Sequence, residues 1–121
     1  MKRFILALTL LLTLAFASQG QTVNDIPIKD IDVDYIQIVG NSSGFSKKVS
    51  IEVDFGQETK AFSSRGDHSI KDENGKVMKF NSMIDALNFF SQNGFDFVQA
   101  YAFSVGNQTV YHYLLRKRKI E

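Results

Sequence analysis

Two strand-like segments on either side of a tight turn constrain the fold more than any other feature of this sequence. Residues 95–105 and 109–116 are rich in aromatic and β-branched side chains, and Gly106-Asn107 separates them. Such side chains favour strands, and this dipeptide suits the two-residue turn of a hairpin. The sequence therefore predicts an antiparallel hairpin whose apolar side chains need a second layer to cover them.

A helix is predicted immediately before this hairpin, over residues 82–93. Ser82 can cap its start, Asp85 follows three residues later, and Gly94 suits the left-handed position past its end. The side chains expected to cluster on one face are Met83, Ile84, Leu87, Phe90 and Ser91.

Two more strands are predicted earlier in the chain. Residues 31–39 alternate with the strand period of two, with Ile31, Val33 and Tyr35 on one side and three aspartates on the other. Residues 49–55 alternate in the same way after a turn rich in glycine and serine, so the second strand is expected to pair back on the first.

Asn74-Gly75 suits a type I′ turn, so a short extra hairpin is predicted within residues 70–80. The polar stretch 56–69 has no clear period. The order ββαββ predicts an α+β fold of two layers, an antiparallel sheet of four strands or more with one helix across one face.

The N-terminal residues predict export. Lys2 and Arg3 precede an uncharged apolar run over residues 4–16, and Ala15 and Ala17 fit a cleavage site for signal peptidase. The predicted division is a signal peptide at residues 1–17, a flexible leader at 18–29 and one domain at 30–121. We expect a periplasmic or secreted protein with no membrane span after cleavage.

Composition and charge exclude several classes of function for this chain. The chain has no cysteine, which excludes a disulfide scaffold, a thiolate metal site and a cysteine nucleophile. Removing Lys2 and Arg3 leaves 12 of 14 basic residues against 13 acidic ones, so the formal charge changes from +1 to −1 and no nucleic-acid partner is expected. A basic run at residues 116–119 suits either a solvated strand end or the steering of an acidic partner.

The helix and hairpin share a pattern with a known family. Residues 85–98 read Asp-Ala-Leu-Asn-Phe-Phe-Ser-Gln-Asn-Gly-Phe-Asp-Phe-Val, and the last strand ends in Tyr-Leu-Leu-Arg-Lys at residues 113–117. The stretch Met83 to Lys117 resembles a family of small bacterial domains of unknown function, in which a helix reading Ala-Leu-Asn-x-Leu runs into Gly-Trp-Glu-Leu-Val and a closing strand reads Tyr-x-Leu-Lys-Arg. Phe95, Asp96 and Phe97 stand where that family has tryptophan, glutamate and leucine. The resemblance implies a fold and no functional residue.

The three aspartates of the first predicted strand imitate the opening of a calcium loop. An EF-hand needs glycine and glutamate where this chain has Tyr35 and Asn41, so Asp30, Asp32 and Asp34 are expected to be surface charges with at most weak cation binding.

No catalytic, cofactor-binding or metal-binding residue is predicted. His68 and His112 lie 44 residues apart and lack the spacing of a metal site. A serine triad built on His68 fails because its neighbours in sequence point apart. Arg65-Gly66-Asp67 matches a tripeptide that adhesion receptors read, a match that also arises by chance. We expect no enzymatic activity.

Aromatic placement gives the functional hypothesis. Alternation places Phe95, Phe97, Tyr101 and Phe103 on one face of the first hairpin strand, opposite Val98, Ala100 and Ala102. One helix covers one sheet face. Either it covers the aromatic side, or an aromatic face is left for a second chain, a loop or a ligand.

The expected function is that of an exported, non-enzymatic domain that acts through protein contact or self-association. The predicted contact residues are Phe97, Tyr101, Phe103, Tyr111 and Tyr113. The alternative is the binding of a small apolar ligand between the sheet and the loop 56–69.

Overall fold

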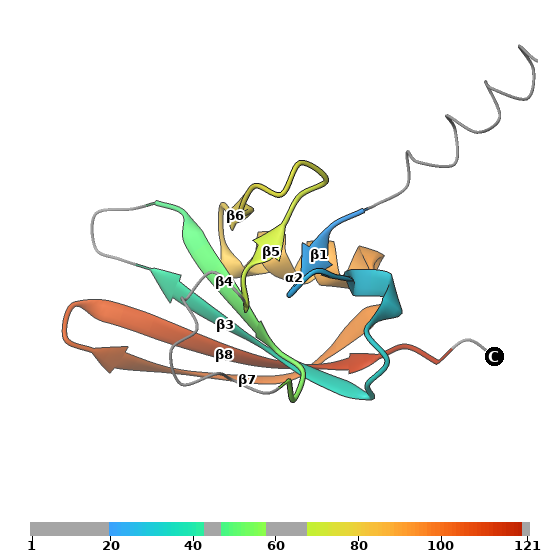
Figure 1. Cartoon of the computed structure of the whole chain (residues 1–121). Coiled ribbons are helices and arrows are strands. Elements are labelled where there is room, and N and C mark those ends of the chain that lie inside the picture. Colours follow the sequence, from blue (N-terminus) through green and yellow to red (C-terminus); the bar gives the residue numbers. More distant parts are fainter. Residues whose placement is uncertain (1–19, 43–46, 58–67, 120–121) are drawn as a thin grey trace, which may run out of the picture.

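A five-stranded antiparallel sheet forms the larger layer of the molecule (Figure 1). The computed structural model describes residues 20–42, 47–57 and 68–119. The strand order is β6-β4-β3-β8-β7, with β6 and β7 at the two edges. The strands are β3 (Tyr35–Ser42), β4 (Val49–Asp54), β6 (Lys79–Phe80), β7 (Phe95–Val105) and β8 (Gln108–Lys117).

A second, three-stranded sheet lies on one side of the first. Its order is β2-β1-β5, and its strands are β1 (Thr22–Val23), β2 (Ile26–Pro27) and β5 (Ile70–Lys71). Asn24 and Asp25 both have positive φ, which is the conformation of a type I′ turn between β1 and β2. The 3-10 helix η1 (Ile28–Asp30) follows.

The segment expected to be a flexible leader is therefore folded over residues 20–29. Val23 and Ile28 are fully buried, because β1 pairs with β5 from the middle of the chain. The predicted signal peptide lies outside the described residues.

The helix α2 (Met83–Gln92) completes the second layer. Ser82 caps it by accepting a hydrogen bond from the Asp85 amide, and Asp85 in turn accepts one from the Asn81 amide. Gly94 adopts φ +91° just past the end, as predicted. The buried side chains are Met83, Ala86 and Phe90, whereas Ile84, which was expected on the same face, is exposed.

The core lies between the five-stranded sheet and the layer that α2, η1 and the small sheet form. We call the sheet face toward this core the inner face and the opposite one the outer face. The inner face carries Ile36 and Ile38 from β3, Ile51 and Val53 from β4, and Phe95 and Leu115 from the hairpin. Phe90 of α2 packs edge-on against Phe95, with ring centroids 6.1 Å apart.

The prediction of an α+β fold is confirmed, and the finer topology needs correction. The chain forms two antiparallel sheets of three and five strands, whereas one four-stranded sheet in the order ββαββ was predicted. The difference arises from β1, β2, β5 and β6, which are two residues long and too short to show a period.

The predicted face of the first strand is also wrong. The strand begins at Tyr35, and its inward side chains are Ile36 and Ile38, while Tyr35 is half exposed. Ile31 is buried, but it follows η1 and does not belong to the strand. Asp30, Asp32 and Asp34 are exposed and precede the strand.

The turn at Asn74-Gly75 forms without the predicted type I′ geometry. Gly75 has φ +79° and donates to the Asp72 carbonyl, while the Asp72 amide donates to the Lys76 carbonyl. Lys71 pairs with Val77 across this turn in a single bridge. Of the two turn residues only the glycine has positive φ, which is typical of a type I turn followed by a bulge.

Candidate functional site

A β-bulge in β7 divides the predicted contact residues between the two faces of the sheet. Phe97 lies opposite Leu115 and Gln99 lies opposite Leu114, so Val98 is an extra residue without a partner. Residues that lie opposite each other in a ladder share a face. The bulge therefore reverses the alternation beyond Val98.

The predicted common face of Phe95, Phe97, Tyr101 and Phe103 is wrong for this reason. Phe97, Tyr111 and Tyr113 lie on the inner face, whereas Tyr101 and Phe103 lie on the outer face. The sequence gives no sign of the bulge, because Val98 is a β-branched residue that suits a regular strand.

The inner side of the hairpin is only partly covered. Tyr111 and Tyr113 are partly buried against the core, and Phe97 packs on Tyr113 with ring centroids 5.7 Å apart. The side chain of Phe97 is still 53% exposed. Phe97 lies near the start of β7, an edge strand whose only neighbour among the described strands is β8.

The outer side carries three stacked rings. Tyr101 lies flat on His112, with centroids 4.6 Å apart and planes 4° apart. Phe103 stacks on His112 at 5.2 Å and on Tyr101 at 6.5 Å. Tyr101 and Phe103 nevertheless keep 53% and 48% of their surface exposed. We call Tyr101, Phe103 and His112 the ring stack.

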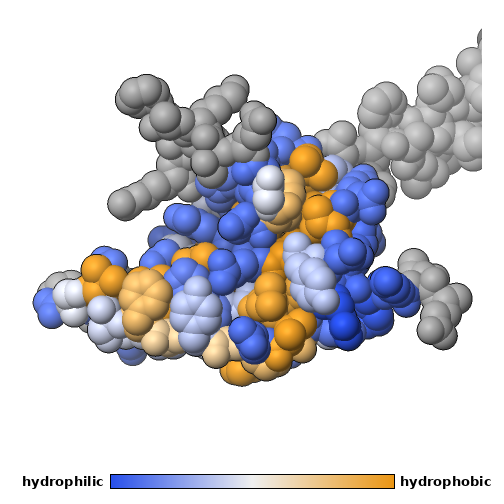
Figure 2. All heavy atoms as spheres, turned by 90° about the horizontal axis from the view of Figure 1, so that it is seen from below, coloured by the Kyte–Doolittle hydropathy of each residue, from blue (hydrophilic) through white to orange (hydrophobic). Residues whose placement is uncertain are grey.

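The ring stack adjoins further apolar surface along β7. Val98 and Val105 are also exposed. Figure 2 views the molecule from the side on which β7 lies, and hydrophobic residues form a broken band across it. Exposed aromatic residues in such a band are typical of protein-contact surfaces.

His112 has no polar partner among the described residues. Both ring nitrogens are buried, and neither makes a hydrogen bond there. His112 therefore contributes to the site as a flat stacking surface.

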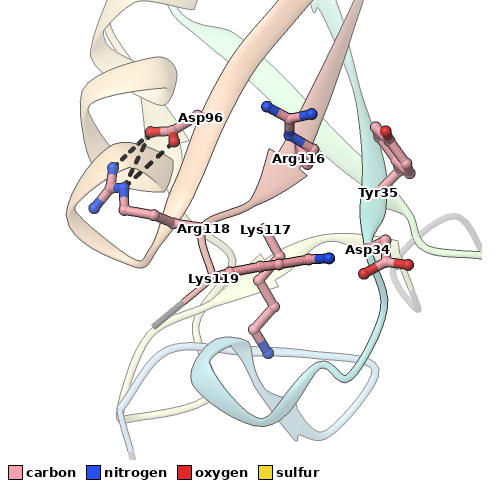
Figure 3. A pocket seen from close by; sticks show the side chains of 7 residues that line it. All are labelled: Asp34, Tyr35, Asp96, Arg116, Lys117, Arg118 and Lys119. Carbon is pink, nitrogen blue, oxygen red and sulfur yellow. Dashed lines mark hydrogen bonds and ion pairs between the residues drawn. The ribbon is translucent and has the colours of Figure 1, made fainter. Parts of the chain in front are cut away.

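A charged pocket of about 390 Å³ lies at the other end of the hairpin (Figure 3). Its lining residues are Asp34, Tyr35, Asp96, Arg116, Lys117, Arg118 and Lys119. Arg118 donates to Asp96 at 2.7 Å, and this hydrogen bond holds the pKa of Asp96 below, and that of Arg118 above, its ordinary value. Lys117 donates to the Ile31 carbonyl at 2.5 Å. Of the four basic side chains that line the pocket, Lys117 and Arg118 therefore make hydrogen bonds within the protein.

A second hollow, of about 410 Å³, lies on the outer face beside Gln57 and His68. The Gln57 side-chain amide donates to the Val53 carbonyl and to Nδ1 of His68. The other lining residues are Val39, Glu52 and Asp54. Gln57 and His68 belong to the segment 56–69 of the alternative ligand hypothesis, and the lining of the hollow combines the apolar Val39 and Val53 with the charged Glu52 and Asp54.

The structure does not bring the two histidines together. His68 and His112 belong to different surroundings, the hollow and the ring stack. Within residues 20–42, 47–57 and 68–119, no group of three side chains could hold a metal ion. Arg65-Gly66-Asp67 lies outside the described residues.

Comparisons with protein families, with curated proteins and with solved structures found no significant match. The resemblance of residues 83–117 to a bacterial family therefore stays a prediction. In the described part of the chain, no helix combines the length and the apolar character that crossing a membrane requires.

Proposed function

We propose that this protein is an exported, non-enzymatic domain that acts through protein contact or self-association at the ring stack and the adjoining edge of β7. The observation that carries the proposal is the stack itself. Three flat side chains are held parallel on the outer face, and two of them keep about half of their surface exposed.

The stacking favours binding in two ways. Tyrosine and phenylalanine offer large contact areas, and aromatic residues are enriched at the centres of interfaces. Rings that already hold each other in place lose little side-chain freedom when a partner arrives, so less of the binding free energy is lost to ordering.

The hairpin offers a matched pair of variants for a test. Tyr101→Ser combined with Phe103→Ser removes the exposed rings of the outer face, whereas Phe97→Ser removes an equally exposed ring from the inner face. We expect the double variant to lose the self-associated or partner-bound species in analytical ultracentrifugation and crosslinking of the native envelope. Phe97→Ser should keep that species. Equal loss in both variants, or a wild-type chain with no associated species, would count against the proposal.

Export can be tested separately. Mass spectrometry of the protein recovered from the cell envelope or medium should show cleavage after Ala17 or after Gly20. Small residues precede both cleavage positions, as signal peptidase requires. An intact Met1 in a cytoplasmic fraction would contradict export.

The hollow beside Gln57 supports a second, weaker candidate, the binding of a small apolar ligand. Its volume is sufficient for such a ligand. However, Glu52 and Asp54 line it, and an apolar ligand would remove water from these carboxylates without replacing their hydrogen bonds. Titration with a fluorescent apolar probe tests this candidate function. Saturable binding that Val39→Asp abolishes would support ligand binding in the hollow, and no saturable binding would contradict it.

A further inference from the structure

We propose that the partner at this surface is a second copy of the chain, and that β7 pairs antiparallel with β7 of the other copy around a two-fold axis at Ala102. This inference rests on the proposed function and names its partner. The two five-stranded sheets would then join into one continuous sheet across the two copies.

Beyond its bulge, the edge strand β7 lacks the other features that usually prevent edge pairing. Natural edge strands are short, or carry charges, proline or a bulge that turns the edge away. Between the bulge at Val98 and the turn at Gly106, residues 99–105 read Gln-Ala-Tyr-Ala-Phe-Ser-Val, without charge, proline or glycine. Among the strands that the structure describes, β8 is the only neighbour of β7.

The register toward β8 fixes which backbone groups of β7 point away from β8. Val105 and Gln108 close the two-residue turn, so they form the first hydrogen-bonded pair of the ladder. Every second residue then bonds to β8, and the residues between them point their N–H and C=O groups away from it. The outward residues in this segment are Ala100, Ala102 and Ser104.

These outward residues are self-complementary around Ala102. In an antiparallel pair centred there, Ala102 lies opposite Ala102 of the second copy, and Ala100 lies opposite Ser104. This arrangement allows about six backbone hydrogen bonds, because each of the three residue pairs exchanges two. The bulge and the turn limit the segment on either side, so Ala102 is its central residue.

The side chains fit the same register. On the outer face, Tyr101 of one copy would lie opposite Phe103 of the other, which extends the ring stack across the axis as a favourable cross-strand aromatic pair. On the inner face, the paired side chains would be the small Ala100, Ala102 and Ser104, which leave the strands free to approach.

The charges also permit this arrangement. Asp96 is the nearest charged residue of β7, and it is already paired with Arg118. In the proposed register the two Asp96 residues lie roughly 35 Å apart, since each residue advances a strand by about 3.4 Å. That separation exceeds the screening length of about 8 Å at physiological salt, so the charged ends do not repel the second copy.

A single cysteine at the axis tests the register directly, because the chain has no cysteine of its own. Residues opposite each other in a hydrogen-bonded antiparallel pair have Cα atoms about 5.5 Å apart, which suits a disulfide. Under mild oxidation of the full-length mature protein, Ala102→Cys should give a disulfide-linked dimer. Ala100→Cys alone should not, whereas a mixture of Ala100→Cys and Ser104→Cys should give the mixed dimer.

A proline variant supplies an independent measurement. Ala102→Pro removes one outward N–H per copy and spares the ladder to β8, so circular dichroism should stay unchanged while dimerisation weakens at least about tenfold in analytical ultracentrifugation. A dimer that persists in this variant would overturn the proposed pairing, as would a wild-type dimer that Ala102→Cys fails to crosslink.

The outcomes separate this inference from the proposed function. If Ala102→Pro and Ala102→Cys show no edge pairing but Tyr101→Ser with Phe103→Ser still abolishes association, contact through the ring stack stands and edge pairing fails. If the wild-type chain stays monomeric yet loses a different bound protein in the double variant, the partner is another chain. If neither set of variants changes any association, both proposals fail.

Discussion

The phenol ring of Tyr101 lies flat against the imidazole of His112, with planes only 4° apart, although the two residues belong to different strands. Their register places them directly opposite each other in the β7-β8 ladder. The contact exists because the bulge at Val98 turns Tyr101 to the outer face, where His112 already lies.

Replacing this histidine with phenylalanine should stabilise the protein. His112→Phe keeps a flat ring in the stack and removes two buried nitrogens that lack partners among the described residues. A buried polar group without a hydrogen bond costs about 1–3 kcal/mol, so we expect the free energy of unfolding to rise by about 1–2 kcal/mol. Urea unfolding at fixed protein concentration measures the change. His112→Ala, which also removes the ring, should lower the free energy of unfolding. A lower free energy of unfolding in both variants would contradict this account.

Gly40 lies where Met83 of α2 packs against the sheet. A Cβ at this position would overlap the Met83 sulfur and lie 3.1 Å from Cγ1 of Val49. Gly40→Ala should lower the free energy of unfolding by about 1 kcal/mol, the low end of the range for overpacking, because the overlapping atoms are the flexible end of the Met83 side chain. Gly20→Ala is the matched control, because a Cβ there meets nothing within 4 Å.

The same contact predicts coupling between two sites. In a Met83→Ala background, Gly40→Ala should lower the free energy of unfolding by less than it does in the wild type, because the overlapping Met83 side chain is absent. A double-mutant cycle with urea unfolding measures the difference. Purely additive effects would show that Met83 is not the cause of the strain.

The start of α2 gives a fourth prediction. Ser82→Ala removes the hydroxyl that accepts a hydrogen bond from the Asp85 amide, so the free energy of unfolding should fall by about 1 kcal/mol. Ser82→Asp keeps an acceptor at the cap and should stay close to the wild type. The urea midpoint should shift without a change in the m-value. Equal stability of the alanine and aspartate variants would show that the cap contributes little.

The elements that the sequence predicts well are those with local causes. Ser82 and Gly94 mark the ends of α2 by capping and by positive φ, which depend on neighbouring residues alone. Gly106 marks the turn of the β7-β8 hairpin in the same way, with φ +59°. Long strands with a clear period, such as β4, also follow the prediction.

The elements that the sequence does not predict depend on distant partners. Thr22–Val23 forms a strand because Ile70–Lys71 pairs with it, and a two-residue strand has no period to read. Asn24-Asp25 is a detectable type I′ turn signal, and it could have shown that this segment is folded. Around Tyr35 the apolar set of alternate residues switches from Ile31 and Val33 to Ile36 and Ile38, so a period read from Ile31 selects the wrong inward face for β3.

The candidate site shows the same limit. The aromatic content of the hairpin was visible, but its division between two faces depends on one unpaired residue, Val98. A one-residue shift moves every later side chain to the other face. The sequence pattern does not predict the stacking of His112, because alternation relates a residue to its own strand and carries no information about the strand beside it.

The ion pair at the charged end of the hairpin predicts a dependence on pH. The Arg118 guanidinium, through its hydrogen bond to Asp96, is the main cause that lowers the pKa of that carboxyl. A carboxyl whose pKa is lower in the folded state contributes stability above its unfolded pKa, and this contribution is lost as the pH falls through the folded value. The wild type should therefore have a higher free energy of unfolding than Arg118→Gln at neutral pH. This difference should disappear as the pH falls into the acid range.

An NMR titration of the Asp96 side-chain carboxyl checks the cause. In Arg118→Gln its pKa should rise toward the ordinary value, and in Arg116→Gln it should rise less, because Arg116 acts only through the weaker Coulombic attraction. Both residues of the pair are about half exposed, so high salt should reduce the effect. If the pKa of Asp96 were the same in all three proteins, the hydrogen bond seen in Figure 3 would not persist in solution.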